Sequence, residues 1–137
     1  MKSGIKITIP SQFRKNLSKN LVIARGINIC LFLYGEKSWK KVKNELEKYA
    51  EKSTSRDTLR FINLFLSGSE KIKMSKDGKI TISSYMADYA NLKKNIVLID
   101  FGPRTRLSIW DKEEFRKYKD KAKNKISKNI LKHISLV

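Results

Sequence analysis

Apolar and polar residues alternate in two short stretches of the chain, Lys6–Pro10 and Lys79–Ser83, whose sequences KITIP and KITIS differ only at the last position. A period of two residues predicts a strand with one buried and one exposed face. Each stretch is followed by a short segment in which apolar residues have helical spacing. This repetition predicts that one structural unit occurs twice along the chain.

Two further pairs of apolar runs extend the repeat, and the offset between matched positions changes only from 73 to 76 residues. Each run has the length and composition of a strand, and turn residues stand at Arg25-Gly26 and Gly102-Pro103. Each unit is therefore predicted to contain two more strands. The matched runs are Asn20–Ala24 with Asn95–Ile99, and Cys30–Tyr34 with Arg106–Trp110.

A long helix is predicted at the end of each unit, over Glu36–Lys52 in the first and from Asp111 to about Lys123 in the second. Each helix carries one stripe of apolar residues, which predicts that this side is buried. The stripes are Trp39, Val42, Leu46 and Tyr49 in the first helix and Phe115, Tyr118 and Ala122 in the second.

The segment between the units predicts a connecting helix, then a strand over Glu70–Met74 and a tight turn over Met74–Lys79. Strands on either side of a tight turn commonly pair, so we expect a hairpin whose tip carries Lys76 and Lys79. The start, body and stop of the connecting helix are Ser55–Asp57, Thr58–Leu66 and Ser67–Ser69.

The order of elements predicts an α+β fold of two tandem units, each with a strand, a short helix, two strands and a long helix. The first unit covers residues 1–53, the connecting helix 54–68, the second unit 69–122 and a basic amphipathic C-terminal stretch 123–137. This last stretch has three interpretations: a helix packed on its own unit or on a neighbouring subunit, a frayed tail, or an anchor on a membrane surface.

The chain of 137 residues is strongly basic, with 31 Lys and Arg against 13 Asp and Glu and a net charge of +18. Each half carries the same excess, because 14 basic and 5 acidic residues precede Phe65 and 17 and 8 follow it. Such an excess of positive charge favours a polyanionic partner, and nucleic acid is favoured over an anionic membrane surface. The codon bias of an AT-rich genome is an alternative explanation for part of the lysine content, but it does not explain so few acids.

Enzyme signatures are missing from the sequence, which has no phosphate-cradling glycine loop and no metal-ligand spacing of His and Cys. The single Cys30 lies in an apolar run, which indicates a buried thiol in a reducing compartment. His133 is interpreted as a surface residue. Without a signal core or a membrane-spanning run, the chain is predicted to be cytoplasmic, without cofactor, metal or small-molecule substrate.

Three runs, Arg25–Tyr34, Phe65–Gly68 and Ile109–Lys112, together with the twofold repeat, resemble the MraZ family of bacterial transcription regulators over nearly the whole chain. The resemblance implies two swapped-hairpin units of the AbrB type, related by a pseudo-twofold axis. It also implies a ring-shaped homo-oligomer that binds double-stranded DNA of the nucleoid at direct repeats upstream of division and cell-wall genes. No cofactor is implied.

The family carries an Asp-x-x-x-Arg signature in each half, and its Arg is associated with DNA contact. The signature falls on Lys2–Lys6 and Ser75–Lys79, so neither copy has the acid and both have Lys in place of Arg. An Arg grips guanine or phosphate with a planar fork, whereas Lys is a point charge. Two alternatives therefore stand beside a specific regulator: a nucleic-acid binder of low specificity, and a structural ring without DNA readout.

Candidate DNA contacts follow from this alignment. Lys6 and Lys79 occupy equivalent positions and come first, with Lys2 and Lys76 near them on the same loops. Other basic residues of the first half are candidates for phosphate contacts that fix position without reading sequence. These are Arg14, Lys15 and Arg25. Trp39 and Trp110 have two interpretations, base stacking and core packing, and their apolar periodic surroundings favour the core.

Family members have a further strand before the first signature, and this chain begins almost on the signature. We therefore expect the first hairpin to lack a strand. Three explanations are open: a true truncation, a start codon placed too late, or another segment that completes the sheet, such as one from a ring neighbour.

Overall fold

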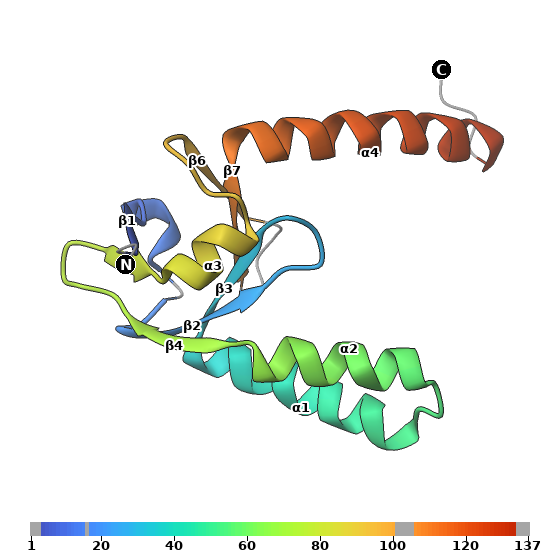
Figure 1. Ribbon diagram of the computed structural model, residues 1–137, viewed down its shortest axis with the longest axis horizontal. Coiled ribbons are helices and arrows are strands. Elements are labelled where there is room, and N and C mark those ends of the chain that lie inside the picture. Colours follow the sequence, from blue (N-terminus) through green and yellow to red (C-terminus); the bar gives the residue numbers. More distant parts are fainter. Residues whose placement is uncertain (1–3, 16, 101–105, 134–137) are drawn as a thin grey trace.

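The computed structural model describes residues 4–15, 17–100 and 106–133. It has a mixed α+β architecture, with antiparallel strands gathered at one side and the long helices extending away from them (Figure 1). In chain order the elements are β1 (Ile5–Thr8), the short 3₁₀ helix η1 (Ser11–Phe13), β2 (Asn20–Arg25), β3 (Leu31–Gly35), α1 (Glu36–Lys52), α2 (Arg56–Ser67), β4 (Glu70–Lys73), β5 (Lys79–Ile82), α3 (Ser84–Tyr89), β6 (Ile96–Asp100), β7 (Arg106–Asp111) and α4 (Lys112–His133).

The helices begin where capping residues stand. The side chain of Ser55 accepts a hydrogen bond from the backbone N–H of Thr58 at 3.2 Å and opens α2. The buried carboxylate of Asp111 accepts the N–H of Glu113 at 3.1 Å and opens α4. The bounds predicted for α1 are confirmed, but α4 continues to His133, so the helix end expected near Lys123 is wrong.

The strands form two antiparallel sheets, one of five strands in the order β4-β2-β3-β7-β6 and one that pairs β1 with β5. The predicted hairpin around the turn at residues 74–79 is therefore wrong, because β4 pairs with β2 and β5 pairs with β1. Both strands find partners from the first half of the chain, and these pairings draw them into different sheets. The turn itself is present and lies at the end where the two sheets meet.

The strand registers relate the two halves by a local twofold axis. In the two-stranded sheet Lys6 faces Thr81. Their repeat equivalents, Lys79 and Thr8, face each other in the same way. The middle of the large sheet is reciprocal in the same way, since Leu31 faces Ile109 and Leu33 faces Leu107. The repeat seen in the sequence is therefore a structural repeat as well, and its two copies share one continuous sheet.

Two apolar clusters lie on the two faces of the large sheet. One packs the inner sides of β1 and β5 against the sheet through buried residues that include Ile9, Ile80 and Ile82. The other gathers aromatic residues of β3, β7 and the long helices, among them both tryptophans. Trp110 is 2% exposed and Trp39 packs on Phe65 with ring centroids 5.7 Å apart, which supports the core interpretation of the tryptophans.

Cys30 lies in the aromatic cluster and is 1% exposed. Burial raises the pKa of its thiol to about 11, so the thiol is protonated at neutral pH. The prediction of a buried thiol is confirmed. None of the helices among the described residues is both long and apolar enough to cross a membrane.

Candidate nucleic-acid interface

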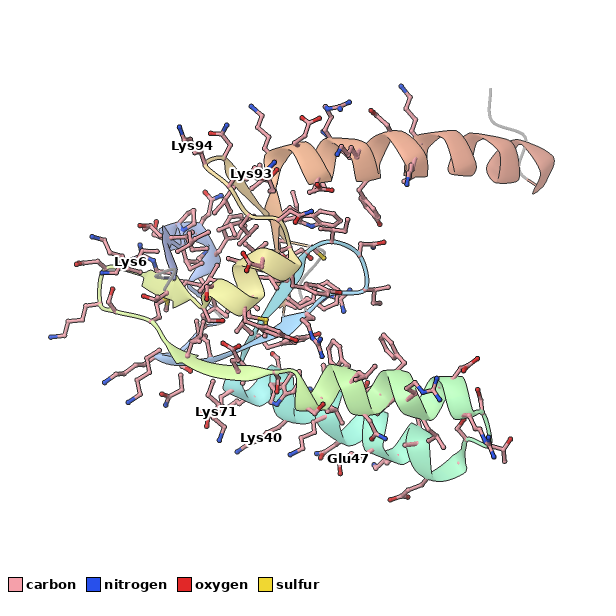
Figure 2. All side chains as sticks on the ribbon, in the orientation of Figure 1. Lys6, Lys40, Glu47, Lys71, Lys93 and Lys94 are labelled. Carbon is pink, nitrogen blue, oxygen red and sulfur yellow. The ribbon has the colours of Figure 1, made fainter. Side chains whose placement is uncertain are left out.

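The outer face of the two-stranded sheet is polar and basic. On one side, alternate residues are half-buried in β1 and buried in β5, while Lys6, Thr8, Lys79 and Thr81 are exposed on the other. Lys6 and Lys79 are diagonal neighbours across the strand pair, and residues in such positions are typically about 7 to 8 Å apart, within reach of long side chains. The structure therefore brings the two leading sequence candidates together on one exposed face. Figure 2 shows Lys6 projecting outward at the edge of the molecule.

The turn that leads into β5 is rigidly built. The N–H of Ser75 donates to the carbonyl of Lys79 at 2.9 Å, and the N–H of Gly78 donates back to the carbonyl of Ser75 at 2.9 Å. Gly78 has φ +79°, a left-handed conformation that favours glycine. Lys76 is exposed on this turn, next to the face that carries Lys79.

Arg14 fastens this turn to the end of β1. Its Nε donates to the carbonyl of Ile9 at 2.7 Å and its Nη2 donates to the carbonyl of Asp77 at 2.8 Å. The side chain is half-buried and lies directly over Gly78, where an added Cβ would collide with the guanidinium. This geometry gives Arg14 a positioning role in the tip, whereas the next residue, Lys15, is exposed. Phosphate contact by either residue stays a prediction.

Arg25 stands apart from the other candidates. It ends β2, whereas the turn adjoins the start of that strand through a hydrogen bond from the N–H of Met74 to the carbonyl of Lys19 at 2.8 Å. The length of β2 separates the two ends by roughly 16 Å. The guanidinium of Arg25 donates to the carbonyl of Leu64 and to the hydroxyl of Tyr85, each at 3.0 Å. Lys2 lies outside the described residues.

Two lysines that precede strands of the five-stranded sheet were not among the candidates predicted from the sequence. Lys19 and Lys94 are exposed, and each directly precedes a repeated strand, at Asn20 and Asn95. They are equivalent in the repeat, which is the signal that could have identified them. Lys19 adjoins the turn through the hydrogen bond with Met74, and Figure 2 shows Lys94 projecting from the turn before β6. The local twofold thus adds a second pair of cations.

The chemistry available at this face is that of ammonium and hydroxyl groups. Such groups bind phosphate oxygens and base edges by hydrogen bonds and charge, without bond making. Within the part of the chain that the structure describes, no three His, Cys, Asp or Glu side chains are grouped to hold a metal ion. The face is therefore suited to binding a polyanion.

Comparison with known proteins gives consistent matches. A family model described as "MraZ protein, putative antitoxin-like" matches residues 6–61 and 65–133. A protein of Clostridium tetani (strain Massachusetts / E88) named "Transcriptional regulator MraZ" is 34% identical over 115 residues, which cover 84% of this chain and 78% of that protein. A protein of the same name from Natranaerobius thermophilus is 33% identical over 129 residues, covering 94% and 87%. By these matches the chain belongs to the MraZ family.

Proposed function

We propose that this protein is a transcription regulator that binds double-stranded DNA sequence-specifically through the outer face of the β1–β5 sheet. The observation that carries the proposal is the pairing of β1 with β5, which brings Lys6 and Lys79 onto one exposed face. The net charge of +18 gives this face a field attractive to phosphate. The names of the relatives, all transcriptional regulators, point to the same activity.

The fold detail behind this proposal is a pair of AbrB-type swapped hairpins. Its support is the crosswise pairing: β4 and β5 flank one turn, yet both pair with strands of the first half. The turn between β4 and β5 is held from both sides, because β4 pairs with β2 and β5 pairs with β1. A fixed tip favours recognition, since little conformational entropy is lost on binding.

Lysine in place of the family arginine shapes the proposed mechanism. Each ammonium of Lys6 and Lys79 makes point-charge contacts, so one tip discriminates bases weakly. Thr8 and Thr81, which stand opposite these lysines, add hydroxyls that can bind a base edge or a phosphate. A homo-oligomeric ring would present several such tips to direct repeats upstream of division and cell-wall genes. Linked weak contacts then gain affinity through effective concentration.

In this proposal the protein acts in the cytoplasm on the nucleoid, without cofactor or catalytic step. The loss of arginine from both signatures favours one second candidate, a nucleic-acid binder of low specificity. Affinity then comes from the basic surface as a whole, and DNA sequence matters little. The two candidates differ in a single measurable quantity, the ratio of affinities for two duplexes of equal length.

A binding titration against the protein's own upstream DNA and a scrambled duplex separates the candidates. We expect at least a tenfold tighter dissociation constant for the upstream DNA, and weaker binding of both duplexes when salt is raised from 50 to 200 mM, as counterion release requires. Equal affinities would support the low-specificity binder. Affinity that does not respond to salt would contradict DNA binding through this basic face.

A further inference from the structure

A groove lies between the edge of the five-stranded sheet and helix α1. Its volume is about 670 Å³, and its lining comes from β2, from the first part of α1 and from β4. Because β4 stands at one end of the strand order, no strand within the described part of the chain pairs with its outer side. This free edge presents backbone N–H and C=O groups that another polypeptide can pair with.

Four lysines line this groove from two sides. Lys71 and Lys73 come from β4, at alternate positions that place them on one face of the strand. Lys40 and Lys43 come from α1, at a spacing that places them on one side of the helix. Figure 2 shows Lys40 and Lys71 projecting at the same margin of the molecule. Four positive charges gathered in this way attract an anionic ligand.

These lysines are not neutralised by the protein itself. All four are exposed, and among the described residues none of them takes part in an ion pair. Glu36, at the start of α1, is the single acid among the lining residues that the structure describes. The groove therefore keeps a positive excess that a ligand can compensate.

The groove also has an apolar lining. Val22 faces Lys71 across the strand pair and is 5% exposed, and Trp39 is half-buried beside it in the lining. A DNA duplex would bring phosphates to the lysines but would leave this apolar lining unused. A ligand that fits both features combines negative charge with a large apolar side chain.

The free edge of β4 identifies a polypeptide as this ligand. An extended segment that pairs with an edge strand gains main-chain hydrogen bonds, and its alternate side chains lie on one face of the sheet. On the groove face they would stand beside Lys71 and Lys73, where acidic side chains are favoured. A further copy of this chain is disfavoured at this edge, because its net charge is +18. The fitting partner is acidic.

The groove and the proposed DNA-binding face lie on opposite sides of the large sheet. Ile72 packs into the cluster beneath β1 and β5, whereas its neighbours Lys71 and Lys73 are directed to the other face, towards α1. A segment bound in the groove would therefore leave Lys6 and Lys79 uncovered. One chain can hold DNA and a protein partner at the same time.

We infer that the groove between β4 and α1 binds an extended acidic segment of a partner protein. The segment pairs with the free edge of β4, its carboxylates bind the lysines on the two sides of the groove, and one large apolar side chain rests against Val22 and Trp39. This surface is separate from the proposed DNA-binding face, and its ligand is a different class of molecule. The inference does not depend on the DNA-binding proposal.

The test uses a fluorescein-labelled peptide of about ten residues in which glutamate alternates with threonine and phenylalanine replaces one central glutamate. Fluorescence anisotropy with the full-length protein is expected to show saturable binding. A peptide with glutamine in place of glutamate should bind at least tenfold more weakly, because the charge-assisted contacts are lost. N-methylation of alternate backbone amides should weaken binding by a similar factor, because it removes the hydrogen bonds to the edge strand.

Substitutions in the protein locate the binding. Lys40→Ala combined with Lys71→Ala removes one charge from each side of the groove and should weaken peptide binding about tenfold. The matched control combines Lys41→Ala with Lys48→Ala, which removes two exposed charges of α1 outside the groove lining. It should change the affinity less than threefold. All four side chains are exposed, so circular dichroism should show an unchanged fold.

Several results would overturn the inference. These are the absence of saturable binding, equal affinity for the glutamate and glutamine peptides, full binding by the N-methylated peptide, or equal loss in the control variant. A scrambled duplex that displaces the peptide and loses affinity itself in the Lys40→Ala, Lys71→Ala variant would show a nucleic-acid surface instead. Specific binding of upstream DNA without any peptide binding would overturn this inference alone.

Discussion

Replacing Lys6 and Lys79 together with alanine is expected to weaken binding to the upstream DNA about a hundredfold, since each charge-assisted contact contributes on the order of 1.5 kcal/mol. Both side chains are exposed on the outer face of the β1–β5 sheet, so their loss should leave the fold unchanged. Fluorescence anisotropy with labelled duplex measures the effect, and thermal unfolding verifies that stability is retained.

The control for this pair is Lys48→Ala, which removes one exposed charge from α1, away from the sheet. It should change affinity less than threefold if binding is local, because a single distant charge contributes little at physiological salt. If the loss of DNA affinity per charge removed is the same for the Lys6 and Lys79 variant as for Lys48→Ala, DNA is attracted by the basic surface as a whole. Restoring the family residue in Lys6→Arg and Lys79→Arg should raise the preference for upstream over scrambled DNA.

Leu33→Ala and Ile109→Ala should each destabilise the protein by about 3 kcal/mol, within the usual range for truncating a buried aliphatic side chain. The two residues are repeat equivalents, both are 0% exposed, and they lie on adjacent strands where the halves join. Because β3 and β7 belong to one sheet, both substitutions should lower the midpoint of the same single transition. Urea unfolding followed by tryptophan fluorescence and by circular dichroism measures this.

Independent folding of the two halves would give a different result. Leu33→Ala would then shift only the signal of Trp39 and Ile109→Ala only that of Trp110, because the tryptophans lie in different halves. Two resolved transitions in either variant would contradict a shared core. An exposed substitution such as Tyr49→Ala should leave the midpoint nearly unchanged and serves as the control.

Local features of the fold could be predicted from the sequence. The bounds of α1 follow from its apolar stripe, and the start of α2 follows from Ser55, whose side chain caps the helix. The equivalence of Lys6 and Lys79 follows from the repeat alone. The two helix signals depend on neighbouring residues in the chain, and the repeat is found by comparing two short segments, so all three are read directly from the sequence.

Long-range pairings could not be predicted in this way. The turn before β5 has the residues of a hairpin, but the choice of partner strands depends on sheet contacts with β1 and β2, so the hairpin prediction failed. The hydrogen bonds of Arg14 and Arg25 could not be predicted either, because only their charge, which suggested phosphate contact, is visible in the sequence. Their donors reach backbone carbonyls 63 and 39 residues away in sequence, at Asp77 and Leu64, contacts that composition does not encode.

The most direct test of the central claim is to locate DNA on the protein by cross-linking. A thiol-linked photoreactive group on Thr81→Cys would lie on the outer face opposite Lys6, while the same group on Tyr49→Cys would lie on α1. Cys30 is buried and protonated, so it should resist labelling. We predict efficient cross-linking of upstream DNA from position 81 and little from position 49. Equal cross-linking from both positions, or cross-linking from position 49 alone, would contradict DNA binding through the β1–β5 sheet.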